Sequence, residues 1–357
     1  MSEPRHLDYL DALRGYAILG VIALHLSQHY PELPLPVQRF LTSGSEGVHL
    51  FFLVSAFTLM RSWTERRDGV GAFYLRRLFR LAPMWWLAIL GWTIARMIVP
   101  ALSGQSGPGG FDILLTATFV HGWSVSAYND VVPGGWSIAS EAMFYLIFPL
   151  LAVTLTSAAR AVAFALAAAI LVVALESVVS SWIIPFAPAK VKADYFFFWF
   201  PAQLPAFALG IAAFHAVRVS RPPRWVAEIA VAAGLVTVAS LPALDRSGAL
   251  LYGCAFALIA YGLAQGAGRY LVRRAIAWIG QRSYSAYFWH LAILPLTLPW
   301  PMPLPLRFAL VLAATLALSH LTYHWVELPS ISLGKRLLAR LRRPAISGAL
   351  PAAGSGP

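Results

Sequence analysis

Apolar stretches long enough to cross a bilayer recur along almost the whole chain. Runs of roughly 20 residues rich in Leu, Ala, Val, Ile and Phe are typical of transmembrane helices. The pattern predicts an all-α polytopic membrane protein with about ten transmembrane helices. The predicted segments are 12–30, 45–61, 83–101, 136–156, 161–183, 195–216, 225–243, 248–265, 284–299 and 304–324.

An eleventh apolar stretch, 111–123, is shorter and is interrupted by His121 and Gly122. Short segments of this kind are typically re-entrant or interfacial. If this stretch does not cross and the N-terminus is cytoplasmic, twenty Lys and Arg residues lie on the inner side and five on the outer side. That asymmetry obeys the positive-inside rule, so we expect both termini in the cytoplasm.

Composition narrows the class of protein further. The 357 residues are 59% hydrophobic and 12% charged, and the mean hydropathy is +0.68. These values exclude an ordinary soluble enzyme, a disordered chain and a coiled coil. The net charge of +12 is explained by the positive-inside rule, without nucleic-acid binding. The single cysteine, Cys254, excludes an intramolecular disulfide and a thiolate metal cluster.

We expect a single membrane domain over residues 1–335, followed by a tail over 336–357 that is first basic and then disordered. The tail ends in Ala, Gly, Pro and Ser residues, a composition that does not support a packed core.

The first predicted span carries two ionisable side chains, Arg14 and His25. Eleven helical residues make three turns plus about 20°, so the two lie on one face, separated by a rise of about 16 Å. Arginine binds phosphate through a fixed fork of donors, whereas histidine can take up and return a proton near neutral pH. One face therefore offers an anion anchor near the cytoplasm and a proton-transfer group deeper in. Alternatively, Arg14 snorkels to the interface and His25 bonds a neighbouring helix.

Two further ionisable residues lie in predicted spans. Glu141 is placed toward the outer side, at a depth similar to that of His25, where a carboxylate could orient the imidazole. The alternative is a purely structural hydrogen-bonded pair. His49 lies near the outer interface, where the functional and the structural interpretations both stay open.

A basic amphipathic stretch, residues 66–83, precedes the third predicted span. Its Arg76, Arg77 and Arg80 alternate with Phe and Leu residues. Such a stretch at the inner surface binds either anionic lipid or a phosphorylated cofactor that arrives from the cytosol.

The last two predicted spans add further polar positions. Tyr284, Tyr287 and His290 are spaced three apart and share a helix face. Tyrosine at a span end often belongs only to the aromatic belt, but His290 lies further into the helix. Glu327 follows the last span, where we expect it to pair with the cytoplasmic arginines.

Six motifs in order resemble the acyltransferase type 3 family of integral membrane acyltransferases. The first is Leu-Asp-Ala-Leu-Arg-Gly with Arg14 and His25 in Arg-x10-His spacing. The others are Gly47 to Leu59, Arg77-Leu-Phe-Arg80, Trp136 to Tyr145, Ser283 to Ile293, and Val326-Glu327-Leu328-Pro329. The resemblance runs over roughly residues 7–335.

The chain departs from the family's motifs at several positions. His49 stands where the family has Asp, Ala142 replaces the second Glu of the fourth-span motif, and Leu328 replaces the closing Arg. A mechanism that needs a carboxylate at 49, or a carboxylate pair at 141–142, is therefore in doubt.

The resemblance implies transfer of an acyl group, most simply acetyl, from cytosolic acyl-CoA to a hydroxyl. Typical acceptors in the family are sugars of cell-surface polysaccharide, lipopolysaccharide or other glycoconjugates, although some relatives modify macrolides or transfer succinyl. We expect no permanently bound cofactor and no metal. Many relatives carry a fused extracytoplasmic esterase-like domain, so we expect either a stand-alone enzyme or one that uses a separate extracytoplasmic partner. Abundant Arg and Ala suggest the cytoplasmic membrane of a GC-rich bacterium.

The resemblance also suggests roles for the polar residues. Arg14, Arg76, Arg77 and Arg80 would hold the donor's phosphates. His25 would act as general base, oriented by Glu141, or would carry the acyl group in a relay. The acceptor side would use His290, Trp136, Tyr287 and His49. A rival interpretation is a proton-coupled transporter of a sugar or lipid-linked intermediate, which also uses intramembrane His, Arg and Glu.

Overall fold

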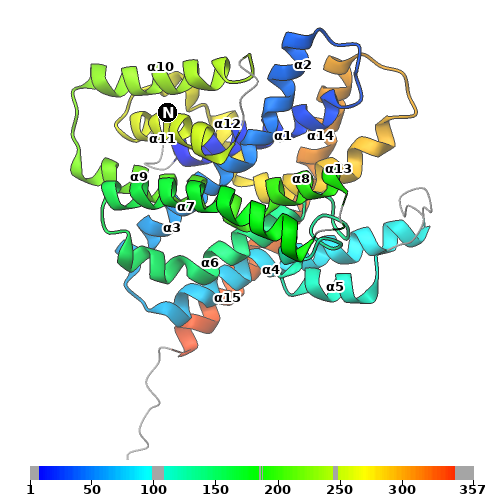
Figure 1. Cartoon of the computed structure of the whole chain (residues 1–357), viewed down its shortest axis with the longest axis horizontal. Coiled ribbons are helices and arrows are strands. Elements are labelled where there is room, and N and C mark those ends of the chain that lie inside the picture. The colour runs from blue at the N-terminus through cyan, green and yellow to red at the C-terminus, as the bar shows by residue number, and fades with distance from the viewer. Residues whose placement is uncertain (1–7, 99–107, 185, 187, 244–247, 342–357) are drawn as a thin grey trace, which may run out of the picture.

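The computed structural model describes residues 8–98, 108–184, 186, 188–243 and 248–341. Within these ranges the chain is entirely helical and forms no β-strand (Figure 1). Helices satisfy every backbone hydrogen bond within one segment, which the bilayer interior requires. The α-helices are α1 (Asp8–Ser27), α2 (Leu35–Thr42), α3 (Gly47–Arg66), α4 (Val70–Ile98), α5 (Gly110–Ala117), α6 (Trp136–Thr154), α7 (Ala158–Val178), α8 (Ala189–Phe198), α9 (Phe200–Val219), α10 (Arg224–Ser240), α11 (Ala249–Ala264), α12 (Arg274–Gln281), α13 (Ser283–Thr297), α14 (Leu304–Thr322) and α15 (Leu328–Leu341).

The all-α polytopic membrane class is confirmed. Each predicted span falls on a helix, and seven helical segments are long and apolar enough to cross a membrane. The other three predicted spans correspond to α10, α11 and α13, which have 17, 16 and 15 residues. The count of ten therefore stays a prediction.

The eleventh apolar stretch forms the short helix α5, followed by a turn and the single 3-10 turn His121–Trp123. Eight α-helical residues extend about 12 Å, less than half of the roughly 30 Å hydrocarbon core. One helix of this length cannot cross the membrane, in agreement with the prediction.

The predicted boundary between the basic stretch and the third span is not a break in the helix. The sequence analysis places residues 66–83 in a surface stretch, but α4 begins at Val70 and passes through Pro83 without a break. Proline removes only one backbone hydrogen bond, which a helix packed among others tolerates. The basic residues of this stretch therefore project from a helix that continues into the span. Residues 99–101, at the other end of the predicted segment, lie outside the described part.

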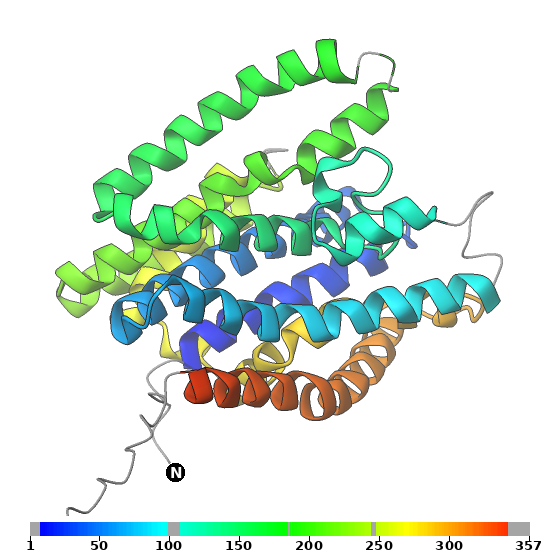
Figure 2. The same ribbon diagram turned by 90° about the horizontal axis from the view of Figure 1, so that it is seen from below.

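Burial differs strongly among the helices. The apolar segment Ala158–Trp182, which contains α7, has the highest mean hydropathy (2.6) and is only 11% buried within the protein, so it faces lipid. The segment with α8 and α9 is 72% buried and forms part of the core. Figure 2 shows α1 and α3 inside the bundle, with α7 along one edge and α14–α15 along the other.

The first turn of α1, the last turn of α15 and the α3–α4 turn lie at one end of the bundle (Figure 2). This arrangement agrees with an even number of crossings, while the cytoplasmic orientation stays a prediction. Helix α14 passes through a π-helical turn, Tyr323–Glu327, into α15, which runs to Leu341 across the predicted domain boundary at 335. The predicted disordered part of the tail, 342–357, lies outside the described residues.

Helix α1 is held at the centre by a very close crossing with α12. A Cβ atom at Gly280 would lie 1.7 Å from the carbonyl oxygen of Asp11, and one at Gly15 would lie 2.2 Å from that of Ile276. No side chain fits at either position unless the backbone moves. The crossing therefore fixes the position of α1 and of the two ionisable residues that it carries.

Replacing Gly280 by Ala is expected to destabilise the protein by about 1–3 kcal/mol, the usual cost of overpacking. The measurement is the melting temperature of the purified protein in detergent. The matched control is Gly91→Ala on α4, where the new Cβ meets nothing within 4 Å and alanine favours the helix. Equal melting temperatures for the two variants would contradict this account of the crossing.

Candidate active site

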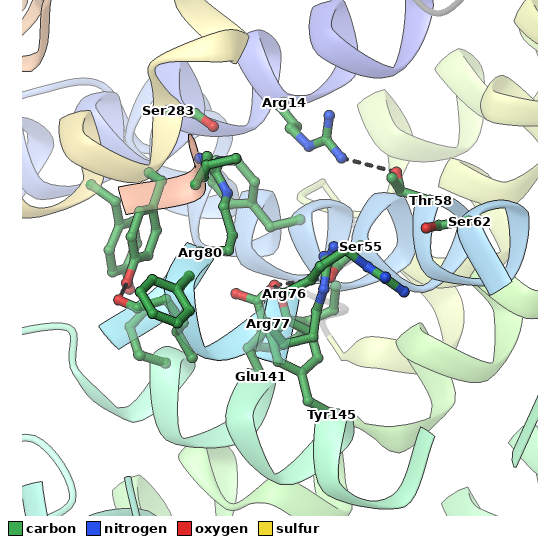
Figure 3. Close-up of a pocket in the computed structure, with 18 of the residues that line it drawn as sticks. Arg14, Ser55, Thr58, Ser62, Arg76, Arg77, Arg80, Glu141, Tyr145 and Ser283 are labelled. Carbon is green, nitrogen blue, oxygen red and sulfur yellow. Dashed lines mark hydrogen bonds between the residues drawn. The ribbon is translucent and has the colours of Figure 1, made fainter. Parts of the chain in front are cut away.

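A cavity of about 360 Å³ lies among helices α1, α3, α4, α6, α13 and α15. Figure 3 shows its polar side chains, which come from helices far apart in the sequence and converge on one space. Six basic residues and a single carboxylate line the cavity, which makes it suited to an anionic ligand. These residues are Arg14, Arg66, Arg76, Arg77, Arg80, Lys335 and Glu141.

All four arginines predicted to hold a donor lie on this cavity. Three of them have a carboxylate of their own. Arg14 donates to Asp11 (2.8 Å) and to Thr58 (2.9 Å), Arg76 forms a two-pronged ion pair with Asp68, and Arg80 pairs with Glu327. The pairing of Glu327 with an arginine at the inner end was expected from the sequence.

Arg77 differs from the other three because no ion pair with a carboxylate is found for it within the described residues. Its guanidinium lies over the rings of Phe73 and Tyr145, 6.0 and 5.8 Å from the ring centroids. Its Nε is buried without a hydrogen-bond partner in the described structure. A buried donor without a partner is costly, so this guanidinium is prepared for an incoming anion.

Glu141 lies in the same cavity, close to the arginines (Figure 3). It accepts hydrogen bonds from Ser55 (2.9 Å) and from the hydroxyl of Tyr145. The hydrogen bonds found for Glu141 in the described structure do not include one to His25. The structure therefore brings Glu141 together with the predicted donor-binding arginines, and not with the predicted base.

The structure pairs His25 with His290, which is 265 residues away. Nδ1 of His25 lies 3.2 Å from Nε2 of His290, and the ring centroids are 5.1 Å apart. The Nδ1 atoms also lie near backbone carbonyls, at 2.9 Å from Val21 O for His25 and at 3.1 Å from Ala286 O for His290.

These contacts define the tautomers of the pair. A carbonyl oxygen only accepts, so each Nδ1 carries the proton in the neutral ring. The Nδ1–H of His25 is then shared between Val21 O and the Nε2 lone pair of His290. The lone pair on Nε2 of His25 takes part in neither of these contacts, so in this tautomer Nε2 is the nitrogen that can accept a further proton.

Tyr287 connects the cavity to the histidine pair. It lines the cavity, and its ring centroid lies 5.7 Å from that of His290. Its hydroxyl donates to Gly134 O (3.0 Å) and accepts from Ser137 (3.0 Å). Neither His25 nor His290 lines the cavity itself. Tyr287 therefore forms the wall between the cavity and the two imidazoles.

The turn that holds Tyr287 is braced by His121. This side chain is 1% exposed, and its Nε2–H donates to Gly135 O at 3.0 Å. Burial lowers the pKa of His121 to about 4, so the ring is neutral at physiological pH. Its ring also stacks on Trp85, which fixes the turn from below. Sequence reasoning did not assign His121 a role, because nothing local shows what it contacts.

Besides His290, two further predicted substrate-binding residues, His49 and Trp136, do not line the cavity. His49 is 3% exposed and lies between Glu46, with which it forms a buried ion pair, and Gln203 Oε1 at 2.8 Å. Glu46 thus supplies a carboxylate one helical turn before the position where the resembling family has Asp. Trp136 is buried against Phe52 and Phe198, with ring centroids 6.2 and 4.7 Å away.

Several cavity residues were not assigned to the site from the sequence. Arg66 was counted only as part of the inner positive charge, and Lys335 was assigned to the end of the domain. Tyr145, Ser55 and Thr58 line the cavity as partners of Glu141 and Arg14. Only Tyr145 gave a signal in the sequence, because it follows Glu141 by one helical turn. Ser55 and Thr58 lie on a different helix from the residues that they contact. Within the described residues no group of three or more His, Cys, Asp or Glu could hold a metal ion.

Comparison with known proteins identifies relatives of the chain. A family profile described as "Acyltransferase domain" matches residues 7–324. The chain is 31% identical over 156 residues to the acyltransferase MdmB of Streptomyces mycarofaciens, which covers 40% of this chain and 38% of that protein. It is 30% identical over 165 residues to the O-acetyltransferase OatA of Staphylococcus aureus, which covers 42% of this chain and 25% of OatA.

A putative O-acetyltransferase of Staphylococcus aureus strain COL is 28% identical over 169 residues, 43% of this chain and 26% of that protein. The matched region thus spans a quarter to two fifths of the length of these relatives. No solved structure matches the chain.

Glu327 is expected to stabilise the protein mainly by neutralising Arg80. Its side chain is fully buried and also accepts from Ser285 at 2.5 Å, whereas Arg80 is about one third exposed. Glu327→Gln should therefore lower the free energy of unfolding by about 1–3 kcal/mol, less than for a fully buried pair. Adding Arg80→Gln should recover part of that loss in a double-mutant cycle followed by thermal unfolding. Additive effects of the two substitutions would show that the pair is not coupled.

Proposed function

The chain belongs to the acyltransferase 3 family, whose domain profile covers most of its length, and from that premise we propose what this membrane acyltransferase uses as donor and acceptor. The proposed donor is acyl-CoA, most simply acetyl-CoA, taken from the cytosol. The proposed acceptor is a hydroxyl of a sugar in a cell-surface polysaccharide, lipopolysaccharide or another glycoconjugate. We place the protein in a bacterial cytoplasmic membrane.

The cavity beside the histidine pair is the observation that carries this proposal. It combines six basic residues with one carboxylate at the end of the bundle where the positive-inside rule places the cytosol. Acyl-CoA is a cytosolic thioester with several phosphate charges, and guanidinium–phosphate contacts are strong in a partly desolvated site. Arg14, Arg77 and the paired arginines Arg76 and Arg80 would hold the phosphates, while the pantetheine arm extends toward Tyr287.

The chemistry proposed for His25 follows from its tautomer. Nε2 of His25 takes the proton of the acceptor hydroxyl while the hydroxyl oxygen attacks the thioester carbonyl carbon. The new C–O bond forms, the C–S bond breaks, and the proton on His25 passes to the departing CoA thiolate. His290 is a positioning residue, because it accepts the Nδ1–H of His25 and favours the charged ring. The Tyr287 hydroxyl would donate to the developing oxyanion after it gives up its bond to Gly134 O.

An acyl group carried transiently on His25 remains the second route for this step. In that route Nε2 of His25 attacks the thioester, CoA leaves, and the acceptor hydroxyl then takes the acyl group from the imidazole. The separation of the cavity from the histidine pair by Tyr287 suits such a relay. Among acyl groups and acceptors, succinyl transfer and macrolide acceptors are the alternatives within the family.

Donor binding should depend on Arg77, whose guanidinium has no carboxylate partner in the described structure. Arg77→Gln is expected to weaken CoA binding about tenfold or more, the loss of one or two charge-assisted hydrogen bonds. The measurement is the CoA-dependent rise in melting temperature of the purified protein, since a ligand of the native state stabilises it. Unchanged CoA binding by the Arg77 variant would contradict the proposed donor site.

Catalysis should depend on His25 and, to a smaller extent, on His290. His25→Ala is expected to lower the transfer rate about 10²- to 10⁴-fold, and His290→Leu about 10- to 100-fold, with CoA binding retained in both. His290→Asn, which keeps an acceptor for the His25 Nδ1–H, should recover part of the rate. The assay is transfer of labelled acetyl from acetyl-CoA to endogenous acceptors in isolated membranes.

Wild-type turnover by a folded His25→Ala protein would contradict the proposed base. An acetyl-CoA pool that is not consumed by the wild-type protein, together with uptake of a sugar intermediate, would instead support the transporter interpretation.

A further inference from the structure

We propose that the cavity recognises its donor at two separate anion sites, and that Arg66 and Lys335 at its rim bind the 3′-phosphate of CoA. This inference rests on the proposed acyl-CoA donor and adds which part of the donor the protein recognises at the rim. It predicts a preference for free CoA thioesters over donors without a 3′-phosphate, among them thioesters on the phosphopantetheine arm of a carrier protein.

Only half of the basic side chains in the cavity have a carboxylate partner in the described structure. Of its six basic side chains, Arg14, Arg76 and Arg80 each have a carboxylate partner. For Arg66, Arg77 and Lys335, no ion pair with a carboxylate is found in the described ranges. Arg66 only donates to Ser62 at 3.2 Å. The positive charge left for a ligand is therefore carried by these three residues.

The three residues occupy two different depths. Arg77 is partly buried and lies against the Tyr145 ring of α6. Arg66 and Lys335 are both exposed, at the last residue of α3 and near the middle of α15. Lys335 lies eight residues, about 12 Å along a continuous helix, beyond Glu327, the partner of Arg80. The positive charge without a carboxylate partner thus extends from the partly buried Arg77 to the exposed rim, which suits a ligand with two separated anionic groups.

Helix α15 is built to hold Lys335 at this place. Gly334 is buried, and a Cβ on it would lie 2.9 Å from two atoms of the Phe79 side chain on α4. The absence of a side chain lets α15 lie directly on α4, so that Ile331, Gly334 and Lys335 form one wall of the cavity. Helix α15 thus holds Lys335 on the cavity wall, beyond the last residue, 324, that the acyltransferase profile matches.

The chemistry of CoA meets these requirements. It carries a diphosphate next to the pantetheine arm and a separate monophosphate on the ribose 3′ oxygen. The diphosphate belongs at Arg77 and the deeper arginines, because the pantetheine arm has to continue toward Tyr287. The 3′-phosphate is then left at the rim, where Arg66 on α3 and Lys335 on α15 both line the cavity. A phosphopantetheine arm on a carrier protein has a single phosphodiester. It therefore has no second phosphate for Arg66 and Lys335 to bind.

The experiment compares CoA with 3′-dephospho-CoA as ligands of the full-length protein in lipid nanodiscs, measured as equilibrium affinities at fixed ionic strength. The wild-type protein is expected to bind CoA roughly tenfold more tightly than 3′-dephospho-CoA. In Arg66→Gln/Lys335→Gln, the affinity for CoA should fall to that for 3′-dephospho-CoA, which itself stays unchanged. Arg77→Gln should lower the affinity for CoA and for 3′-dephospho-CoA by the same factor.

Arg336→Gln is the matched control, since this neighbour of Lys335 is exposed on the same helix but does not line the cavity. It should keep the wild-type preference, and the melting temperatures without ligand should agree among all variants. Equal wild-type affinities for the two ligands, or a preference that survives in the double variant, would overturn the rim site and leave the acyl-CoA donor intact. Failure of the wild-type protein to bind either ligand would overturn the proposed donor as well.

Discussion

Placing a guanidinium in a low-dielectric bundle requires an anion nearby, and this requirement organises the inner half of the protein. Arg14, Arg76 and Arg80 satisfy it with Asp11, Asp68 and Glu327. Only Arg80–Glu327 joins separate helices, α4 and the turn between α14 and α15; the other two pairs are local to α1 and to the start of α4. The remaining positive charge, on Arg66, Arg77 and Lys335, lies on the cavity, where an anionic ligand can supply the missing partner. In the proposed function this ligand is the phosphorylated donor, so the stability of the bundle and the affinity for the donor would follow from the same electrostatic requirement.

Helix α1 connects this charged cavity to the histidine pair. Its Arg14 lines the cavity, and eleven residues later His25 meets His290. The close crossing with α12 at Gly280 holds the helix in place, so Arg14 and His25 keep a constant separation. Tyr287 lines the cavity and lies against His290. In the proposed function, the acyl group of the donor would have to pass this residue.

Much of this arrangement could be predicted from the sequence, because hydropathy, charge asymmetry and helical spacing are patterns of residues that lie near one another in the chain. The helical segments, the shared face of Arg14 and His25, and the basic stretch of α4 belong to this part. The contacts of His25 with His290 and of Arg80 with Glu327 join residues 265 and 247 positions apart, and no local pattern encodes them.

The same limit explains where the expectations failed. Glu141 was matched to His25 by depth alone, whereas the rotation of α6 directs it to Ser55 and Tyr145. Pro83 was interpreted as the end of a surface stretch, although helix packing tolerates it inside α4.

The central claim is that an acyl-CoA enters this cavity with its phosphates at the basic end and its acyl carbon at the histidine pair. The most direct measurement is a cryo-EM structure of the protein in nanodiscs with a non-hydrolysable thioether analogue of acetyl-CoA. The account predicts phosphate density at Arg77 and at the cavity rim, and the acyl group next to Tyr287 within reach of His25. Analogue density bound elsewhere, or an acyl group that points back toward the cytosol, would contradict it.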